Sequence, residues 1–161
     1  MTTFLWYHLG HWLERKSLGG LAASCFRNGA AGGGQLAFEA AFRLVKRLLE
    51  QDRNREAVSA GRDALARNAA DARVWCALGA AHRRLAELPE ARDAYEEAVL
   101  LKPDYAQAWS NLGEWHIVKG NFAEALAKCE QALSFDPGLP EAQNNRVATL
   151  YELGRFAEAE A

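Results

Sequence analysis

The histidines of this sequence are its first candidates for chemistry, because imidazole is a common metal ligand and general base. His8 and His11 lie three residues apart, so a helix would bring both rings to one face. Two imidazoles do not complete a structural zinc site, which takes four ligands. His82 and His116 hold equivalent places in two copies of one pattern, and we expect both rings to pack between helices. The histidines therefore predict no metal site.

The cysteines are equally poor candidates for catalysis. Cys25, Cys76 and Cys129 are odd in number and far apart, which excludes a disulfide framework and a CxxC metal pair. Cys25 and Cys76 lack the histidine and acid pattern of an activated nucleophile, and we expect Cys129 to be a small buried hydrophobe. Free thiols favour a reducing compartment, so we expect a cytoplasmic protein.

The glycine-rich stretch GAAGGGQ, residues 29–35, is the remaining candidate for a cofactor site. A phosphate-binding P-loop places a lysine and then a serine or threonine after its glycines, and this stretch has neither. We expect a linker and a shortened helix here, because each glycine inside a helix costs about 1 kcal/mol. No cofactor is predicted.

The composition favours helices and excludes several classes of function. The chain has 161 residues, a formal net charge of -2 and 50% hydrophobic residues, which suits one soluble domain with a core. Prolines number only four, so the sequence predicts an all-α fold. A charge near zero argues against nucleic acid, and no apolar run is long enough to span a membrane. LAASC, residues 21–25, is similar to a lipoprotein cleavage box, but the apolar run before it is short and broken by glycine.

A longer pattern occurs more than once in the chain. WCALGAAH begins at Trp75, WSNLGEWH begins at Trp109, and a looser copy, WYHLGHWL, begins at Trp6. The first two copies continue in one register through the second half of each repeat, as Ala91, Tyr95, Ala98 and Pro103 and as Ala125, Cys129, Ala132 and Pro137. Repetition at the spacing from Trp75 to Trp109 indicates a solenoid built from helix pairs.

This pattern resembles the tetratricopeptide repeat. The resemblance divides the chain into a diverged N-terminal helix pair with a glycine-rich end at 3–37, a diverged repeat at 38–71, two repeats at 72–105 and 106–139, and an incomplete repeat at 140–161. The diverged repeats have Ala41 and Gln143 at the tryptophan position, and Val45 at the glycine position.

The resemblance implies a right-handed α-solenoid of antiparallel helix pairs, the tetratricopeptide superhelix. Gly79 and Ala91 would lie where two helices approach closely, because small residues permit the contact. Pro103 and Pro137 follow the second helices, where a helix must stop.

The resemblance also implies a concave groove lined by first-helix residues that do not serve in packing. These are Arg43, Lys46, Arg73, Cys76, Arg83, Arg84, Ser110, Asn111, Glu114, Asn144, Asn145 and Tyr151. The earlier half is basic, and arginine suits carboxylates, so an acidic segment of a partner is the expected ligand there. The alternative is that these charges form a solvated helix face.

Asn111 and Asn145 share one position in successive repeats. In some tetratricopeptide superhelices, asparagines at this position hold an extended peptide backbone, because an amide both donates and accepts. The ladder is incomplete here, since His8, Arg43 and Ala77 hold the equivalent positions. Capping of local polar groups is the alternative. The family's carboxylate clamp, which needs lysine, asparagine and arginine at set positions, is not present in any register.

The aromatic N-terminus, with Phe4, Leu5, Trp6, Trp12 and Leu13, has two interpretations. Exposed aromatic residues can bind a membrane interface or a partner. We expect burial against Phe38, Ala41 and Leu44 instead, because Trp6, Leu9 and Leu13 follow helical spacing.

These observations predict a non-catalytic scaffold that binds a protein or peptide, with no nucleic acid and no membrane. One alternative is the substrate-recruiting N-terminal segment of a larger bacterial enzyme, such as a glycosyltransferase or methyltransferase. Another is a homo-oligomeric scaffold that associates through uncapped repeat ends, since the last repeat stops partway at Ala161.

Overall fold

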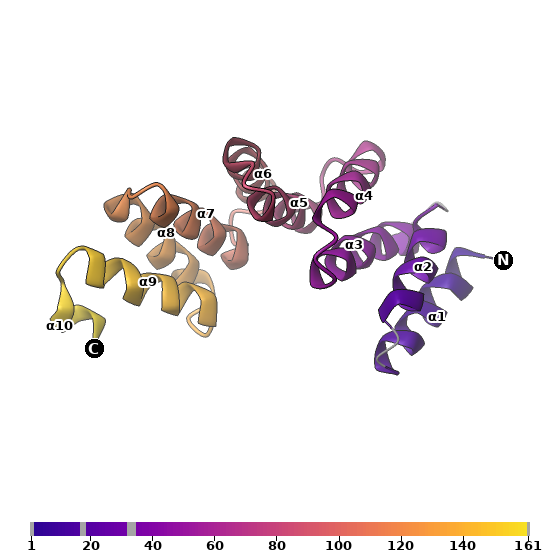
Figure 1. Ribbon diagram of the computed structural model, residues 1–161, viewed down its shortest axis with the longest axis horizontal. Coiled ribbons are helices and arrows are strands. Elements are labelled where there is room, and N and C mark those ends of the chain that lie inside the picture. Colours follow the sequence, from indigo (N-terminus) through magenta and orange to yellow (C-terminus); the bar gives the residue numbers. More distant parts are fainter. Residues whose placement is uncertain (1, 17–18, 32–34, 161) are drawn as a thin grey trace. The chain divides into compact units, whose positions relative to one another are not determined.

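The structure is a computed structural model that describes residues 2–16, 19–31 and 35–160. Within these ranges every regular element is a helix, which confirms the all-α prediction. The helices are α1 (Thr3–Arg15), α2 (Gly19–Ala30), α3 (Gln35–Glu50), α4 (Asn54–Arg67), α5 (Ala72–Arg84), α6 (Leu88–Leu101), α7 (Ala106–Val118), α8 (Phe122–Phe135), α9 (Pro140–Glu152) and α10 (Phe156–Ala159) (Figure 1).

Two compact units divide the chain after Glu87. In the first unit α1 packs on α2, α2 on α3, α3 on α4 and α4 on α5, and α3 also contacts α1 and α5. In the second unit α6 packs on α7, α7 on α8, α8 on α9 and α9 on α10, with a further contact between α7 and α9. Contact of each helix with its nearest neighbours in sequence is the packing expected of stacked helix pairs.

One residue in each of four repeats has a left-handed backbone, always at the same position of the repeat. These residues are Asp52, Ala86, Gly120 and Gly154, with φ of 57°, 61°, 74° and 71°. The next residue then donates its N–H to the carbonyl five residues back, in Arg53 to Leu48, Glu87 to His82, Asn121 to His116 and Arg155 to Leu150. This arrangement is the Schellman motif, which ends a helix and satisfies its last carbonyls. The turn that joins the helices of a pair therefore recurs with the sequence period.

Glycine permits the close helix approach within a pair. A Cβ placed on Gly113 of α7 would lie 2.7 Å from the Cys129 sulfur of α8, and one on Gly10 of α1 would lie 2.5 Å from the Phe26 ring of α2. The diverged repeat 38–71 exchanges the two sizes, with Val45 at the glycine position and Gly61 at the position of Phe26 and Cys129. Glycine is therefore not present at this position in every repeat, and a Cβ placed on Gly61 would lie 3.3 Å from Leu78 of α5.

The side chain at the tryptophan position ties the first helix to the loop before it. The Nε1 atoms of Trp75 and Trp109 donate to the carbonyls of Ala69 and Pro103, each over 2.7 Å. Gln143 replaces tryptophan in the last repeat, and its Nε2 donates to the Pro137 carbonyl over the same 2.7 Å. Glutamine thus reproduces the hydrogen bond without the ring. Ala41 has no side-chain donor and cannot make it.

The aromatic N-terminus differs from our expectation. Leu13 is buried and Trp6 packs against the core of the first unit, but Phe4, Leu5 and Trp12 are 60%, 46% and 48% exposed. The expectation that all of these side chains are buried against the next repeat is therefore wrong. The three exposed residues lie on faces of α1 that are turned away from α2 and α3.

The glycine-rich stretch contributes more helix than its composition suggests. Asn28, Gly29 and Ala30 form the last turn of α2, which has 12 residues. The run of three glycines at 32–34 lies outside the described residues. In the part of the chain that the structure describes, no helix is both long and apolar enough to cross a membrane.

Candidate functional site

The predicted basic surface of the first helices is largely neutralised within the first unit. Arg43 of α3 contacts the carboxylates of Glu14 on α1, at 3.4 Å, and of Glu39, at 3.3 Å. Arg47, which the sequence did not single out, pairs with Glu14 at 2.9 Å and with Glu50 at 2.6 Å. An acidic peptide would have to compete with these carboxylates for both guanidinium groups.

Arg73 at the start of α5 is paired in the same way. Its guanidinium contacts Asp71 at 2.9 Å and Glu39 at 2.8 Å, and it lies over the Phe42 ring. The hydrogen bonds that the Arg73 guanidinium donates, first to Asp71 and then to Glu39, raise the pKa of Arg73. Burial alone would raise the pKa of Asp71, but the hydrogen bonds and charge of Arg73 outweigh burial and lower it. Glu39 therefore joins Arg43 to Arg73 in one network of ion pairs.

The other predicted basic residues have different surroundings. Lys46 of α3 is exposed and makes no ion pair within the described residues. Arg84 is exposed at the end of α5, and its guanidinium donates to the Leu49 carbonyl. Arg83 is half-buried. Lys46 is thus the predicted cation of α3 that has no carboxylate partner in the described ranges.

The second unit brings the two predicted asparagine positions to neighbouring helices. Nδ2 of Asn145 on α9 lies 3.4 Å from both the carbonyl and the hydroxyl oxygen of Ser110 on α7. Asn111 is half-buried on α7, and its Oδ1 accepts from Gln107 over 3.4 Å. Bonds of this length are at the weak end of the hydrogen-bond range. The Asn145 amide is therefore positioned by contacts that a ligand could replace.

The remaining predicted residues of this unit surround the asparagines. Glu114 is half-buried on α7, and Asn144 is exposed on α9. Tyr151 is 49% exposed, and its ring lies 5.5 Å from the ring of Phe156 on α10. Thr149 is buried and donates to the Asn145 carbonyl, which fixes the last turns of α9.

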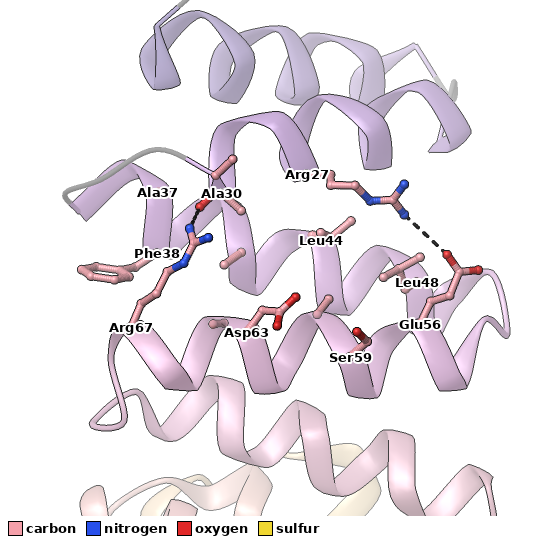
Figure 2. Close-up of a pocket in the computed structure, with 14 residues that line it drawn as sticks. Arg27, Ala30, Ala37, Phe38, Leu44, Leu48, Glu56, Ser59, Asp63 and Arg67 are labelled. Carbon is pink, nitrogen blue, oxygen red and sulfur yellow. Dashed lines mark hydrogen bonds and ion pairs between the residues drawn. The ribbon is translucent and has the colours of Figure 1, made fainter.

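A cavity of about 370 Å³ lies in the first unit, over α3 and between α2 and α4. Figure 2 shows its apolar floor, to which Ala37, Leu44 and Leu48 of α3 contribute. The cavity was not predicted from the sequence. Its signal was present in Ala41, the small residue at the tryptophan position, which also lines it.

Polar side chains cross from α4 to α2 at the two ends of this cavity (Figure 2). Arg27 of α2 pairs with Glu56 of α4 over 3.5 Å, and the Arg67 guanidinium of α4 donates to the Ala30 carbonyl. Asp63 lies on α4 between these ends and also lines the cavity. The result is an apolar pocket with a charged rim.

The histidines and cysteines take structural places. His11 is hydrogen-bonded to the Tyr7 hydroxyl over 3.0 Å, and burial followed by the charge of Arg43 lowers the pKa of His11. His82 is buried and contacts Glu87 at 2.5 Å. Burial raises the pKa of the Cys129 thiol to about 11. Among the described residues, no three or more histidine, cysteine or acidic side chains are grouped so as to hold a metal ion.

The stacked pairs and the recurring left-handed turns define an α-helical repeat protein. The family model described as tetratricopeptide repeat matches residues 42–102 and 76–140, which together span more than half of the 161 residues. The chain belongs to the tetratricopeptide repeat family, as the sequence predicted. No curated protein matches the sequence.

Solved structures have the same fold at low sequence identity. The MamA protein is 21% identical with a TM-score of 0.78, over 98% of this chain and 85% of that one. A thermophilic TPR protein from Thermus thermophilus is 21% identical with a TM-score of 0.80, over 98% of this chain and 86% of that one. A tetratricopeptide repeat protein from Parabacteroides merdae is 15% identical with a TM-score of 0.78, over 98% and 62%. The fold is that of a scaffold for protein interactions.

Proposed function

We propose that this chain binds an extended segment of a partner polypeptide along α7 and α9, and that the amides of Asn111 and Asn145 hold the backbone of that segment. The proposal rests on one observation: both amides occupy the same repeat position on contacting helices, and the Asn145 amide is held there by hydrogen bonds of 3.4 Å. A peptide group offers one donor and one acceptor, which an amide side chain matches. Replacing long bonds with shorter ones favours the complex.

The acidic character of the partner is a second part of the proposal, and it is narrower than the sequence suggested. Arg43 and Arg73 already have carboxylate partners, so Lys46 supplies the uncompensated charge on α3. An acidic residue near Lys46 would gain a solvent-exposed pair, which is worth less than about 1 kcal/mol and weakens as salt is added. Backbone recognition therefore dominates in this proposal. If the chain is the substrate-recruiting segment of a larger enzyme, the same α7 and α9 face would bind the substrate polypeptide. That alternative stays a prediction.

Peptide selection from a random library tests the backbone contact. Peptides selected on the wild-type chain should bind about tenfold more weakly to Asn111→Ala/Asn145→Ala, because two hydrogen bonds contribute roughly 0.5–1.5 kcal/mol each. Methylation of single peptide nitrogens should weaken binding, whereas alanine replacement of the same residues should not.

The matched control is Gln131→Ala, which removes an exposed amide from α8. It should leave affinity unchanged. Equal binding by the wild-type chain and the double asparagine variant would remove the proposal.

A second candidate function is self-association through α1, and the exposure of Phe4, Leu5 and Trp12 favours it. Clustered exposed aromatic residues mark interaction surfaces. Sedimentation at increasing concentration should then show species larger than the monomer, and Phe4→Ser/Trp12→Ser should return them to monomer. A monomer at all concentrations would eliminate this candidate.

A further inference from the structure

The cavity over α3 lies where other repeats place their largest side chains. Ala41 holds the tryptophan position, and the same position of the next repeat holds Trp75. The indole of Trp75 packs against a cluster that includes Leu65 of α4. In the repeat register, the residue of α2 that corresponds to Leu65 is Ala30, which also lines the cavity. The positions that hold Trp75 and Leu65 thus correspond to Ala41 and Ala30 one repeat earlier.

A third small residue enlarges the same space from α4. In repeat 106–139 the Trp109 ring is covered by the Lys128 ammonium, 4.8 Å from the ring centre. The residue that corresponds to Lys128 in repeat 38–71 is Ala60, which lines the cavity as well. The residues that line the cavity at these three repeat positions, Ala30, Ala41 and Ala60, are thus all small.

The walls of the cavity define what fits. The alanines and Leu44 and Leu48 form an apolar surface suited to a ring, and a volume of about 370 Å³ exceeds that of one indole. Asp63 is exposed at the edge, makes no ion pair within the described residues, and offers a carboxylate acceptor to an indole N–H. Phenylalanine would leave that acceptor unused.

We propose that this cavity binds the indole ring of a tryptophan presented by a partner polypeptide. The ring takes the place that Trp75 and Trp109 fill in their own repeats, and the partner provides it in trans. A polypeptide is the source because an apolar centre surrounded by the Arg27–Glu56 pair and Arg67 is the anatomy of an interface anchor site. The site lies on α2, α3 and α4, so it is separate from the proposed α7 and α9 face.

Binding of a minimal probe tests the cavity directly. N-acetyl-tryptophanamide should produce saturable shifts of the methyl NMR signals of Ala41, Leu44 and Leu48, with a Kd on the order of 1 mM, as befits a small fragment. The shifts should vanish in Ala41→Trp, which fills the space from within. Ala60→Leu fills it from α4 and should act alike, so the test survives if one variant fails to fold.

Arg62→Ala is the control, because Arg62 is an exposed residue of α4 that does not line the cavity. It should retain the shifts. Asp63→Ala should weaken the binding of the probe severalfold, because it removes the acceptor of the indole N–H. The absence of any shift at about 10 mM probe, which is tenfold above the expected Kd, would overturn the proposal. Shifts that persist in both filled variants would overturn it as well.

The same peptide library extends the test from the probe to a partner. Selection on the wild-type chain, after depletion on Ala41→Trp, should enrich tryptophan in the recovered peptides, and their affinity should fall about thirtyfold when that tryptophan becomes alanine. Peptides without aromatic enrichment would contradict the proposal.

The outcomes separate this site from the α7 and α9 face. Peptides that lose binding only in Asn111→Ala/Asn145→Ala support that face and overturn the indole site. A larger species in solution that Ala41→Trp and Trp12→Ala both return to monomer would show that a second copy's Trp12 fills the cavity, and it would overturn the assignment to a different partner.

Discussion

Repeats 38–71 and 106–139 have the same turn and different interiors. Asp52 and Gly120 both have positive φ and both precede the hydrogen bond that closes the first helix. Yet Ala41 lines a cavity where Trp109 lies beneath Lys128, and Val45 and Gly61 exchange the sizes of Gly113 and Cys129. The comparison shows that the backbone period does not depend on the signature side chains. A repeat can lose its tryptophan and keep its helices. The space that the ring would fill is then left as a cavity.

The largest expected effect comes from placing valine, the residue at position 45, at the equivalent glycine of repeat 106–139. Gly113→Val should lower the free energy of unfolding by about 3 kcal/mol, because its Cβ would lie 2.7 Å from the Cys129 sulfur and 3.4 Å from the Ala125 carbonyl. Urea denaturation followed by circular dichroism measures it.

Cys129→Gly in the same chain should restore part of this loss, because it removes the sulfur that lies 2.7 Å from the added Cβ. Gly20→Ala is the control, because no atom lies within 4 Å of its added Cβ. A double variant no more stable than Gly113→Val alone would contradict the size-exchange interpretation.

A smaller effect should follow from removing the tryptophan of repeat 106–139. Trp109→Ala should cost about 2 kcal/mol, less than for a fully buried ring because this side chain is half-buried. The change also removes the hydrogen bond to Pro103. Trp109→Gln should be milder, because Gln143 makes the equivalent bond in its own repeat. Thermal unfolding of the two variants compares ring and hydrogen bond, and equal losses would show that the hydrogen bond contributes nothing.

The reverse substitution should stabilise the diverged repeat. Ala41→Trp should raise the free energy of unfolding by about 1 kcal/mol, the usual gain from filling a cavity with apolar surface. The denaturant midpoint of Ala41→Trp should be compared with that of Lys46→Trp, which adds the same ring on an exposed face. The difference separates the effect of burying the ring from the effect of adding a tryptophan. If both variants gained equally, the cavity would not be the cause.

The smallest effect concerns two histidines at one repeat position. His82 contacts Glu87, but the residue that corresponds to Glu87 beside His116 is the neutral Asn121. Burial, and then the charge of Lys128, lowers the pKa of His116, although Glu124 and Glu96 act in the opposite direction.

The unfolded chain, with an ordinary histidine pKa of about 6.5, therefore binds this proton first as the pH falls. The free energy of unfolding should decrease by a few tenths of a kcal/mol from about pH 7.5 to 5.5, and His116→Gln should abolish that part. Denaturation at several pH values measures the slope. An unchanged slope in the variant would assign the pH dependence to other groups.

The repeat register could be predicted from the sequence because its causes are local. Gly113 of α7 meets Cys129 of the very next helix, α8, and the left-handed turns follow directly on the helices that they end. Such features recur at a fixed period, so two clear repeats reveal the fold of the diverged ones. The hydrogen bond of Gln143 is also local, but only the structure shows that an amide replaces an indole there.

The surfaces could not be predicted in the same way, because they depend on side chains from separate helices. The arginine at position 43 is one of a basic series in sequence, but its partner Glu14 lies far earlier in the chain and on another helix. Ala41 suggests lost volume, but the cavity is also lined by Ala30 of α2 and Ala60 of α4, which lie on other helices. Exposure of Trp12 likewise depends on the absence of a described helix over that side of α1.

The left-handed turns also bear on how the chain reaches its native state. The turns at Asp52, Gly120 and Gly154 each join two helices that contact each other, so these contacts are close in sequence, and contacts such as those of α2 with α3 and of α8 with α9 are close in sequence too. Folding rates rise as the mean sequence separation of contacts falls, because less loop-closure entropy is lost before contacts form. A polypeptide with this contact pattern can nucleate in more than one helix pair and propagate along the array, so we expect folding to begin from local hairpins of helices rather than from a single long-range nucleus.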